Sequence, residues 1–145
     1  MIKIRNFNFD IDFEYLSAID KNSFEPNWTL EQFKKTLKQK SILCLIVEYE
    51  NEISGFCICE LHLNRIILLR MCVLPQNRKK GIGKALLEKI KTKITKKRKT
   101  ISAEVRETNL SIQLFLKSQH YKAVKVLRNY FLDTEEDAFV FQYNN

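Results

Sequence analysis

The strongest chemical signal in the sequence is a basic, glycine-containing loop over residues 76–84, which reads QNRKKGIGK. The loop holds two of the three glycines in the chain, Gly81 and Gly83, and joins a strand-like apolar run to a helix-like pattern. Glycine lets a ligand approach the backbone closely, and the N–H groups at a helix start favour an anion. The flanking Arg and Lys side chains add positive charge. The loop therefore predicts a site for a phosphate or pyrophosphate group.

Two well-known phosphate-binding loops do not fit these residues. A Walker loop requires a glycine where this chain has Arg78, and a serine or threonine where it has Ala85. A dinucleotide-binding fingerprint requires a third glycine where the chain has Leu86. The loop therefore indicates phosphate binding of another type.

The four cysteines are further residues that could do chemistry. Cys44, Cys57, Cys59 and Cys72 all lie inside apolar runs, and their spacing does not match a zinc-binding pattern. We expect reduced thiols in the core of a cytosolic protein, and no metal site.

Positive charge is concentrated in one part of the chain. The sequence has 25 Lys and Arg residues against 17 Asp and Glu, a net charge of +8. Residues 78–99 contain 11 basic residues and one acid, Glu88, so this segment carries +10; the remainder has 14 basic and 16 acidic residues, or −2. Such a segment favours a polyanion, either a nucleic acid or a phosphorylated cofactor, although over residues 91–99 a solvated helix face is the alternative. The segment lacks interleaved aromatic residues for stacking on bases, so nucleic-acid binding is not expected.

The elements that must position these residues follow from hydrophobic periodicity and capping signals. A capping box at residues 29–32 begins a helix that presents Phe33 and Leu37 on one face. The other predicted elements are a helix over 11–23, strands over 42–49, 53–61 and 65–73, a helix opening at Gly81 and Gly83, a strand over 100–106, a helix from Asn109 to Ser118, and strands over 121–131 and 137–143.

These elements predict the fold class. The three strands over 42–73 are joined by short turns and should be antiparallel. The strand–helix–strand unit over 65–106 should place its strands parallel through a right-handed crossover. A length of 145 residues fits one domain. We therefore expect a single α/β domain over residues 1–145, with a mixed, mostly antiparallel sheet flanked by helices.

Composition points to a soluble cytoplasmic protein. Hydrophobic residues make up 45% and charged residues 29%, close to the globular average, so disorder is not expected. No apolar run approaches the roughly 18 residues of a membrane span, and the start of the chain lacks a signal-peptide pattern. We expect no membrane partner.

With these residues and elements in place, the sequence resembles the GCN5-related N-acetyltransferase (GNAT) superfamily over nearly its whole length. The cofactor motif of that family, Gln/Arg-x-x-Gly-x-Gly/Ala at a strand–helix junction, is matched by residues 78–83. The preceding strand fits as well, with residues 71–73 (MCV) followed by Pro75. So does the later strand at residues 104–106 (EVR), which is followed by Asn109.

Further matches narrow the resemblance to the N-terminal protein acetyltransferases, closest to the RimI-type enzymes that acetylate the N-terminal alanine of a ribosomal protein. Residues 23–33 resemble the helix 1–2 region of this branch, with Asn27 inserted between the usual proline and tryptophan. Residues 128–131 (RNYF) and 136–138 (EDA) resemble its closing strands.

The resemblance implies that acetyl-CoA is the acetyl donor. The backbone of Met71, Cys72 and Val73 would pair with the pantetheine arm and polarise the thioester carbonyl. Asn109 would hydrogen-bond the same arm, and a plain helix N-cap is the alternative for it. In the family the pyrophosphate lies on the loop amides, a role that carries to Lys79, Lys80, Gly81, Ile82, Gly83 and Lys84, with Arg78 at the first motif position.

The resemblance also assigns residues to the acceptor side. Glu104 would be the general base that takes a proton from the substrate ammonium group; a plain surface position is the alternative. Tyr130 would bind the substrate peptide. Trp28 and Phe24 would line the substrate entrance or form an aromatic staple between two helices. Arg70 would bias the enzyme toward acidic substrates.

One position departs from the family. Leu116 stands where the family has the tyrosine that acts as general acid, and leucine cannot protonate a departing thiolate. Tyr121, Tyr130 or His120 could take over this role, and the sequence does not choose among them. Tyr121 also fits a core position.

The function implied by the resemblance is acetyl-CoA-dependent acetylation of the N-terminal α-amine of a protein, with a ribosomal protein as one candidate. The first alternative is an acetyltransferase that acts on a small-molecule amine or a lysine side chain. The second is a catalytically impaired homologue that binds acetyl-CoA, which the change to Leu116 suggests.

Overall fold

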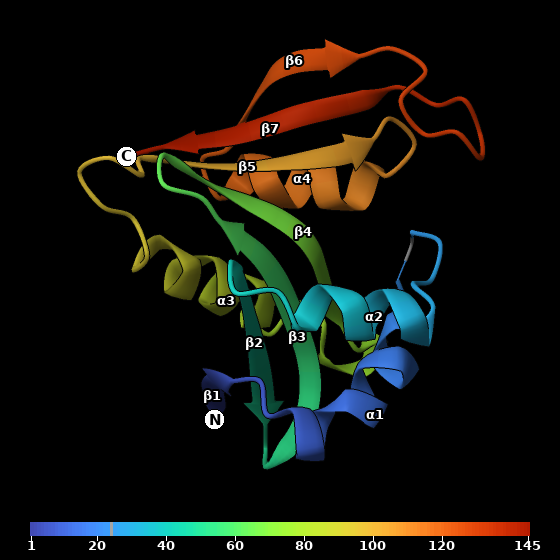
Figure 1. Cartoon of the computed structure of the whole chain (residues 1–145), viewed down its shortest axis with the longest axis vertical. Helices are drawn as coiled ribbons and strands as arrows, with labels where there is room; N and C mark the ends of the chain where they lie inside the picture. The colour runs from blue at the N-terminus through green and yellow to red at the C-terminus, as the bar shows by residue number, and fades with distance from the viewer. Residues whose placement is uncertain (24) are drawn as a thin grey trace.

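The computed structural model describes residues 1–145 except Phe24. A seven-stranded sheet in the order β1-β2-β3-β4-β5-β7-β6 is flanked by helices (Figure 1), so the predicted α/β class is confirmed. No helix among the described residues is long and apolar enough to span a membrane. The elements are β1 (Ile2–Asn6), α1 (Phe9–Asp20), α2 (Leu30–Leu37), β2 (Ile42–Tyr49), β3 (Glu52–Leu61), β4 (Arg65–Val73), the 3-10 helix η1 (Pro75–Asn77), α3 (Ile82–Lys91), β5 (Thr100–Arg106), α4 (Leu110–Ser118), β6 (Lys122–Leu127) and β7 (Ala138–Asn144).

The pairing of β4 with β5 determines where the sheet opens. These strands are parallel, as the crossover through α3 predicts, while the other neighbouring strands pair antiparallel. The parallel ladder covers only residues 65–67 of β4 against 100–102 of β5. Beyond it β4 and β5 diverge, and β5, β7 and β6 turn away from the other strands (Figure 1).

Helices cover both faces of the sheet. Leu86, Leu87 and Ile90 of α3 and Leu116 of α4 pack into one buried cluster on the first face. Residues of α1 and α2, among them Phe33, pack into a second cluster on the opposite face. All four cysteines are free and buried within these clusters, as their positions in apolar runs predicted.

The sequence-based expectations missed one strand and misplaced the ends of two elements: α1, which also ends at Asp20 instead of residue 23, and β6. Strand β1 was not predicted, because five residues of alternating apolar and polar character are too few to separate an edge strand from a loop. Helix α1 begins at Phe9 instead of residue 11, since Asn8 caps it by accepting a hydrogen bond from the N–H of Asp10 (3.1 Å). Strand β6 ends at Leu127, short of the predicted residue 131, and residues 128–137 connect it to β7.

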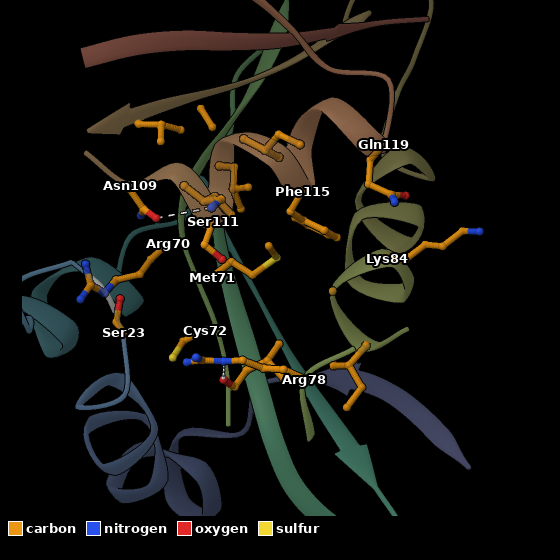
Figure 2. A pocket seen from close by; sticks show the side chains of 18 of the residues that line it. Ser23, Arg70, Met71, Cys72, Arg78, Lys84, Asn109, Ser111, Phe115 and Gln119 are labelled. Atoms are coloured by element: carbon orange, nitrogen blue, oxygen red, sulfur yellow. Dashed lines mark hydrogen bonds between the residues drawn. The ribbon is translucent and has the colours of Figure 1, made fainter. Parts of the chain in front are cut away.

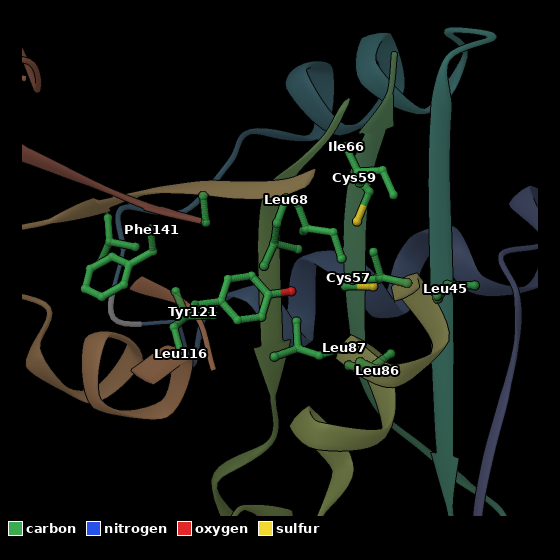
Figure 3. Close-up of a cluster of buried hydrophobic side chains, with 14 of the residues drawn as sticks. Leu45, Cys57, Cys59, Ile66, Leu68, Leu86, Leu87, Leu116, Tyr121 and Phe141 are labelled. Carbon is green, nitrogen blue, oxygen red and sulfur yellow. The ribbon is translucent and has the colours of Figure 1, made fainter. Parts of the chain in front are cut away.

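Tyr121 lies inside the first core cluster, as its core alternative predicted (Figure 3). Its side chain is 2% exposed and points among Leu87, Leu68 and Cys57. Among the described residues its hydroxyl is the buried side-chain polar atom for which no hydrogen-bond partner is found. Burial raises the pKa of Tyr121 above the ordinary tyrosine value. This phenol is therefore neutral and enclosed.

Candidate active site

A bulge in β4 marks the start of the site. Ile58 of β3 pairs with Arg70 and Cys59 pairs with Leu68, so Leu69 is an extra residue in the ladder. A bulge of this kind bends the strand and re-aims its backbone groups. Leu69 lies where β4 has separated from β5.

The backbone edge of β4 beyond the bulge faces the gap between β4 and β5. The N–H of Leu74 donates to the carbonyl of Ser54 (2.8 Å), which fixes the alternation of this antiparallel pair. By that alternation, the N–H and C=O groups of Met71 and Val73 point away from β3. They form an edge on which an extended ligand can hydrogen-bond.

A cleft of about 760 Å³ lies along this edge (Figure 2). Its walls come from β4, the glycine loop, the start of α3, β5 and α4. Lys80 is not among its described lining residues, because its ammonium group lies over the Tyr49 ring, 5.0 Å from the centroid. The other predicted cofactor residues do line the cleft: Met71, Cys72, Val73, Arg78, Lys79, Gly81, Ile82, Gly83, Lys84 and Asn109.

The glycine loop enters α3 through a left-handed residue. Gly81 is the N-cap of α3 with φ of 83°, and a Cβ there would meet no atom within 4 Å, so conformation and not crowding favours glycine. The first helical bond runs from the N–H of Ala85 to the carbonyl of Gly81 (3.0 Å). The N–H groups of residues 82–84 precede this bond and form a helix N-terminus suited to an anion.

Gly83 serves helix packing, which the sequence did not predict. A Cβ at this position would lie only 3.0 Å from Cζ of Phe115. Phe115 projects from α4 toward α3 and lines the cleft (Figure 2). The absence of a side chain at Gly83 therefore lets the Phe115 ring of α4 pack against the backbone of α3.

Arg78 connects the loop to β4 and to the end of α1. Its Nε donates to the carbonyl of Val73 (3.0 Å), and its Nη2 donates to the carbonyl of Asn22 (2.8 Å). The first bond agrees with a Val73 carbonyl that points away from β3. This guanidinium thus occupies one end of the β4 edge.

Asn109 is a helix cap, the alternative that the sequence left open. Its Oδ1 accepts from the N–H of Ile112 (3.4 Å) at the start of α4. Its Nδ2 donates to Oε1 of Glu25 (3.2 Å). The side chain is buried and lines the cleft, so contact with a cofactor arm remains a prediction for it.

Glu104 and Tyr130, predicted separately, are hydrogen-bonded to each other. Glu104 is exposed on β5, and its Oε1 accepts from the hydroxyl of Tyr130 (2.8 Å). This hydrogen bond raises the pKa of Tyr130, because the carboxylate stabilises the phenol in its protonated form. Tyr130 is therefore a hydrogen-bond donor to Glu104 at neutral pH.

A second cleft, of about 320 Å³, shares Glu104 with the first. Trp28 lines it and also packs on Phe33 of α2, with ring centroids 5.1 Å apart, so it has the aromatic packing of the staple alternative and its substrate role remains a prediction. Phe24, predicted beside Trp28, lies outside the described residues. The lining consists of Glu25, Pro26, Asn27, Trp28, Gln32, Ile67, Leu68, Leu69, Arg70, Glu104, Arg106 and Phe131.

Arg70 is held in a buried ion pair that the sequence did not predict, and a bias toward acidic substrates remains a prediction for it. It is 9% exposed, and its Nε donates to Oδ1 of Asp20 (2.5 Å). Its Nη2 donates to the carbonyl of Pro26 (2.8 Å), while the N–H of Trp28 donates to the same Asp20 carboxylate (2.9 Å). The ion pair anchors the loop between α1 and α2 to β4 and so shapes the second cleft.

Leu116 is buried and lines the first cleft. Of the three candidates for the missing acid, Tyr121 is enclosed in the core and His120 lies exposed in the turn after α4. Tyr130 is the candidate that contacts a predicted catalytic residue. Among the described residues that line the first cleft, none is a tyrosine or histidine.

Glu25 and Arg106 belong to the site, and the sequence analysis assigned neither of them a role. Glu25 lines both clefts, and Arg106 lines the second. Arg106 stands in the motif strand next to Val105, so a buried arginine in need of carboxylates could have been suspected. Its partners could not have been chosen from the 17 acids of the chain.

Comparisons with known proteins agree with this geometry. The family model described as "Acetyltransferase (GNAT) domain" matches residues 40–123, more than half of the chain. The [ribosomal protein bS18]-alanine N-acetyltransferase of Haemophilus influenzae is 29% identical over 121 residues, which cover 83% of this chain and 82% of that protein.

Solved structures share the whole fold. The ribosomal-protein-S18-alanine N-acetyltransferase from Escherichia coli superposes with a TM-score of 0.84 at 22% identity, covering 99% of this chain and 94% of that one. Arabidopsis thaliana NAA60 in complex with acetyl-CoA gives a TM-score of 0.86 at 19% identity and full coverage of both chains. The family match, the diverging strands and the glycine loop together identify this chain as a member of the GNAT acetyltransferase family.

Proposed function

We propose that this chain is an acetyl-CoA-dependent protein N-terminal acetyltransferase. The observation that carries the proposal is that two clefts meet at the exposed carboxylate of Glu104; Glu25 also lines both, but Arg106 and Asn109 hold its carboxylate. The first cleft follows the β4 edge to the glycine loop, the second lies between the α1–α2 loop and Phe131, and Glu104 lines both. A donor in one cleft and an acceptor in the other would reach the same general base, in one bound geometry.

The first cleft suits acetyl-CoA. Its volume of about 760 Å³ is in the usual range for small-molecule sites. Lys79, Lys84 and the amides at the start of α3 would hold the pyrophosphate. The backbone groups of Met71 and Val73 would bind the pantetheine arm as an added strand. When bound, acetyl-CoA supplies an acetyl group activated as a thioester.

Glu104 would act as the general base. An α-amine is largely protonated at neutral pH and must lose a proton before it can attack a carbonyl carbon. The exposed Glu104 carboxylate, directly or through a water, would accept that proton. Tyr130 would hold the carboxylate in place through its hydrogen bond, and the family resemblance assigns a peptide-binding tyrosine to its position.

The change of the family tyrosine to Leu116 is compatible with turnover. A departing thiolate resembles that of cysteine, whose thiol pKa is roughly 8.5, so it leaves without a dedicated acid. The alternative that Leu116 favours is a homologue that binds acetyl-CoA without turnover. The test below separates the two.

The proposed acceptor is a protein N-terminus, and a ribosomal protein is the first candidate. The relative from Haemophilus influenzae is named for acetylation of ribosomal protein bS18 at alanine, and it is 29% identical to this chain. Such an acceptor implies action in the cytoplasm.

A panel of amines tests the proposal. Purified protein and acetyl-CoA would be incubated with Ala-, Ser- and Met-starting peptides, an N-blocked lysine peptide and spermidine, with products identified by mass spectrometry. Acetylation at an α-amine is expected, with Glu104→Gln as the inactive control. Acetylation of lysine or spermidine alone would overturn the choice of acceptor. Acetyl-CoA binding without any product would favour the impaired homologue, which Leu116→Tyr would then restore.

A further inference from the structure

The two loops that bound the second cleft are joined by Arg106, the last residue of β5. Its side chain is buried, and it shares a face of β5 with Glu104. Toward the α1–α2 loop, its Nε donates to Oε2 of Glu25 (2.6 Å). Toward the β6–β7 loop, Nη1 and Nη2 donate to the two carboxylate oxygens of Asp133 (3.0 and 3.1 Å), and Nη1 donates to Glu136 (3.2 Å).

Additional contacts make this a junction and not a single ion pair. The guanidinium carbon of Arg106 lies 4.0 Å from the ring centroid of Phe131. The hydroxyl of Thr134 accepts from Nη1 (3.1 Å), which fixes the same loop again. Phe131 follows Tyr130, whose hydroxyl donates to Glu104. The loop that Arg106 holds therefore also carries the partner of the proposed base.

The guanidinium of Arg106 is the cation that holds three carboxylates of the two loops together. The hydrogen bond from Arg106 lowers the pKa of Asp133, and bonds from Thr108, Thr134 and Arg106 lower that of Glu136. Both groups are therefore carboxylates at neutral pH. Without the guanidinium, they would face Glu25 of the opposite loop as like charges. Loss of Arg106 should thus separate the loops.

We propose that Arg106 is a positioning residue for the acceptor, which clamps the α1–α2 loop to the β6–β7 loop and so sets the width of the second cleft. The inference rests on the proposed function, because it takes this cleft as the acceptor site. The donor should be affected much less, since Arg106 is not among the described residues that line the first cleft and reaches that cleft through Glu25.

Kinetics of Arg106→Met and Arg106→Lys provide the first test. We expect the acceptor KM to rise at least tenfold in Arg106→Met, with the acetyl-CoA KM changed less than twofold. Arg106→Lys keeps the charge but lacks the fork that reaches both loops, so an intermediate rise is expected. Arg128→Met is the matched control: Arg128 donates to Asp137 (2.9 Å) within one hairpin and bridges no cleft. An unchanged acceptor KM in Arg106→Met would overturn the proposal.

The two ends of the clamp can also be removed one at a time. Glu25→Ala and Asp133→Ala leave Arg106 in place and lie on opposite loops. If one clamp joins them, the double variant should raise the acceptor KM little more than either single variant does. Independent effects that multiply would contradict a shared clamp. If Arg106→Met does not fold, the Glu25→Ala and Asp133→Ala variants still test the proposal.

Hydrogen exchange gives a readout that needs no activity. Arg106→Met should speed amide exchange in residues 21–29 and 128–137 together, leaving α3 and β4 unchanged. Faster exchange in one loop alone, or in neither, would overturn the clamp. If the wild-type protein acetylates no peptide, the proposed function fails, and exchange still decides whether Arg106 ties the loops.

Discussion

At the scale of single residues, the proposed chemistry depends on a carboxylate held by a phenol. Glu104 projects from β5, and Tyr130 reaches it from the loop after β6, 26 residues further along the chain. The same face of β5 carries Arg106, which secures the loop that delivers Tyr130. In the proposed mechanism three side chains divide the work: Glu104 would take the proton, Tyr130 would orient Glu104, and Arg106 would position the loop.

Substitution of the pair should separate chemistry from orientation. We expect Glu104→Gln to lower kcat/KM for the peptide by about 100-fold or more, the usual effect of losing a general base. Tyr130→Phe removes one hydrogen bond of about 1 kcal/mol and should lower kcat/KM for the peptide about fivefold. Steady-state kinetics on both variants would check this order. Equal losses in both would show that Tyr130 does more than orient the base.

The pH dependence of Tyr130 follows from its raised pKa. Because the folded-state pKa lies above the unfolded value, the stabilisation from this hydrogen bond is complete below about pH 10 and is lost as the pH rises through the folded value. The pH–rate profiles of wild type and Tyr130→Phe should therefore have the same shape up to about pH 9. An alkaline decline below pH 9 that disappears in Tyr130→Phe would contradict this account.

Tyr121→Phe should stabilise the protein without changing its activity. The substitution removes a buried hydroxyl for which the described residues offer no partner. Relief of one such group is worth about 1 kcal/mol. Urea unfolding should show that gain, with kcat within twofold of wild type. A large loss of kcat would instead assign Tyr121 the missing acid role.

At the scale of elements, the site exists because β4 and β5 pair over three residues and then separate. The glycine loop closes one end of the gap, and α4 lies along it with Asn109 at its N-terminus. The ion pair of Arg70 with Asp20 holds the α1–α2 loop from the β4 side, and Arg106 holds that loop from the β5 side. The second cleft is thus framed by two arginines whose side chains are both held in ion pairs.

The conformation of the loop before α3 gives a prediction at this scale. Gly81 has φ of 83°, so Gly81→Ala should lower the free energy of unfolding by about 1 kcal/mol and raise the acetyl-CoA KM. Gly81→Asn is the matched control, because asparagine tolerates the left-handed region better. Chemical denaturation and donor titration would test both. Equal stability of wild type and Gly81→Ala would contradict a conformational requirement for glycine.

At the scale of the whole molecule, the positive charge is concentrated in one segment of the chain. Residues 78–99 carry +10 and the rest of the chain carries −2. The part of this segment at the first cleft suits the phosphates of a donor. Lys96 lies beyond the end of α3, and that helix of 10 residues is about 15 Å long. The length of α3, which separates Lys96 from the glycine loop, exceeds the Debye length of roughly 8 Å at physiological salt. The charge of Lys96 should therefore be screened from a ligand at the loop.

Donor binding should therefore depend on the lysines near the loop and on salt. Lys84→Ala should raise the acetyl-CoA KM about threefold, the effect of an exposed ion pair, and weaken its salt dependence. Lys96→Ala should leave both unchanged. Kinetics at 50 and 300 mM NaCl would check this. An equal effect of the two substitutions would mean that the whole basic segment, and not the loop, attracts the donor.

How much of this organisation could be predicted from the sequence depends on how local each signal is. The strand–helix–strand unit, the glycine loop and the caps at Thr29 and Asn109 follow from neighbouring residues, and the structure bears them out. The ion pair of Arg70 could not be predicted, because its partner Asp20 is 50 positions away. The partners of Arg106 lie 27 to 81 positions away, and the pattern of β5 says nothing of them.

The same holds for Gly83. The glycine motif is visible in the sequence, but its requirement at this position comes from Phe115 on another helix. Close approach between distant elements is set by the packed fold. A sequence pattern carries no direct record of that approach.

The most direct test of the central claim is the site of acetylation on one peptide that offers both kinds of amine. An Ala-starting peptide with an internal lysine would be incubated with acetyl-CoA and either wild type or Glu104→Gln, and the product sequenced by tandem mass spectrometry. Our account predicts acetyl on the α-amine with wild type, and loss of that product with Glu104→Gln. Acetyl on the lysine, or an undiminished rate in the variant, would contradict it.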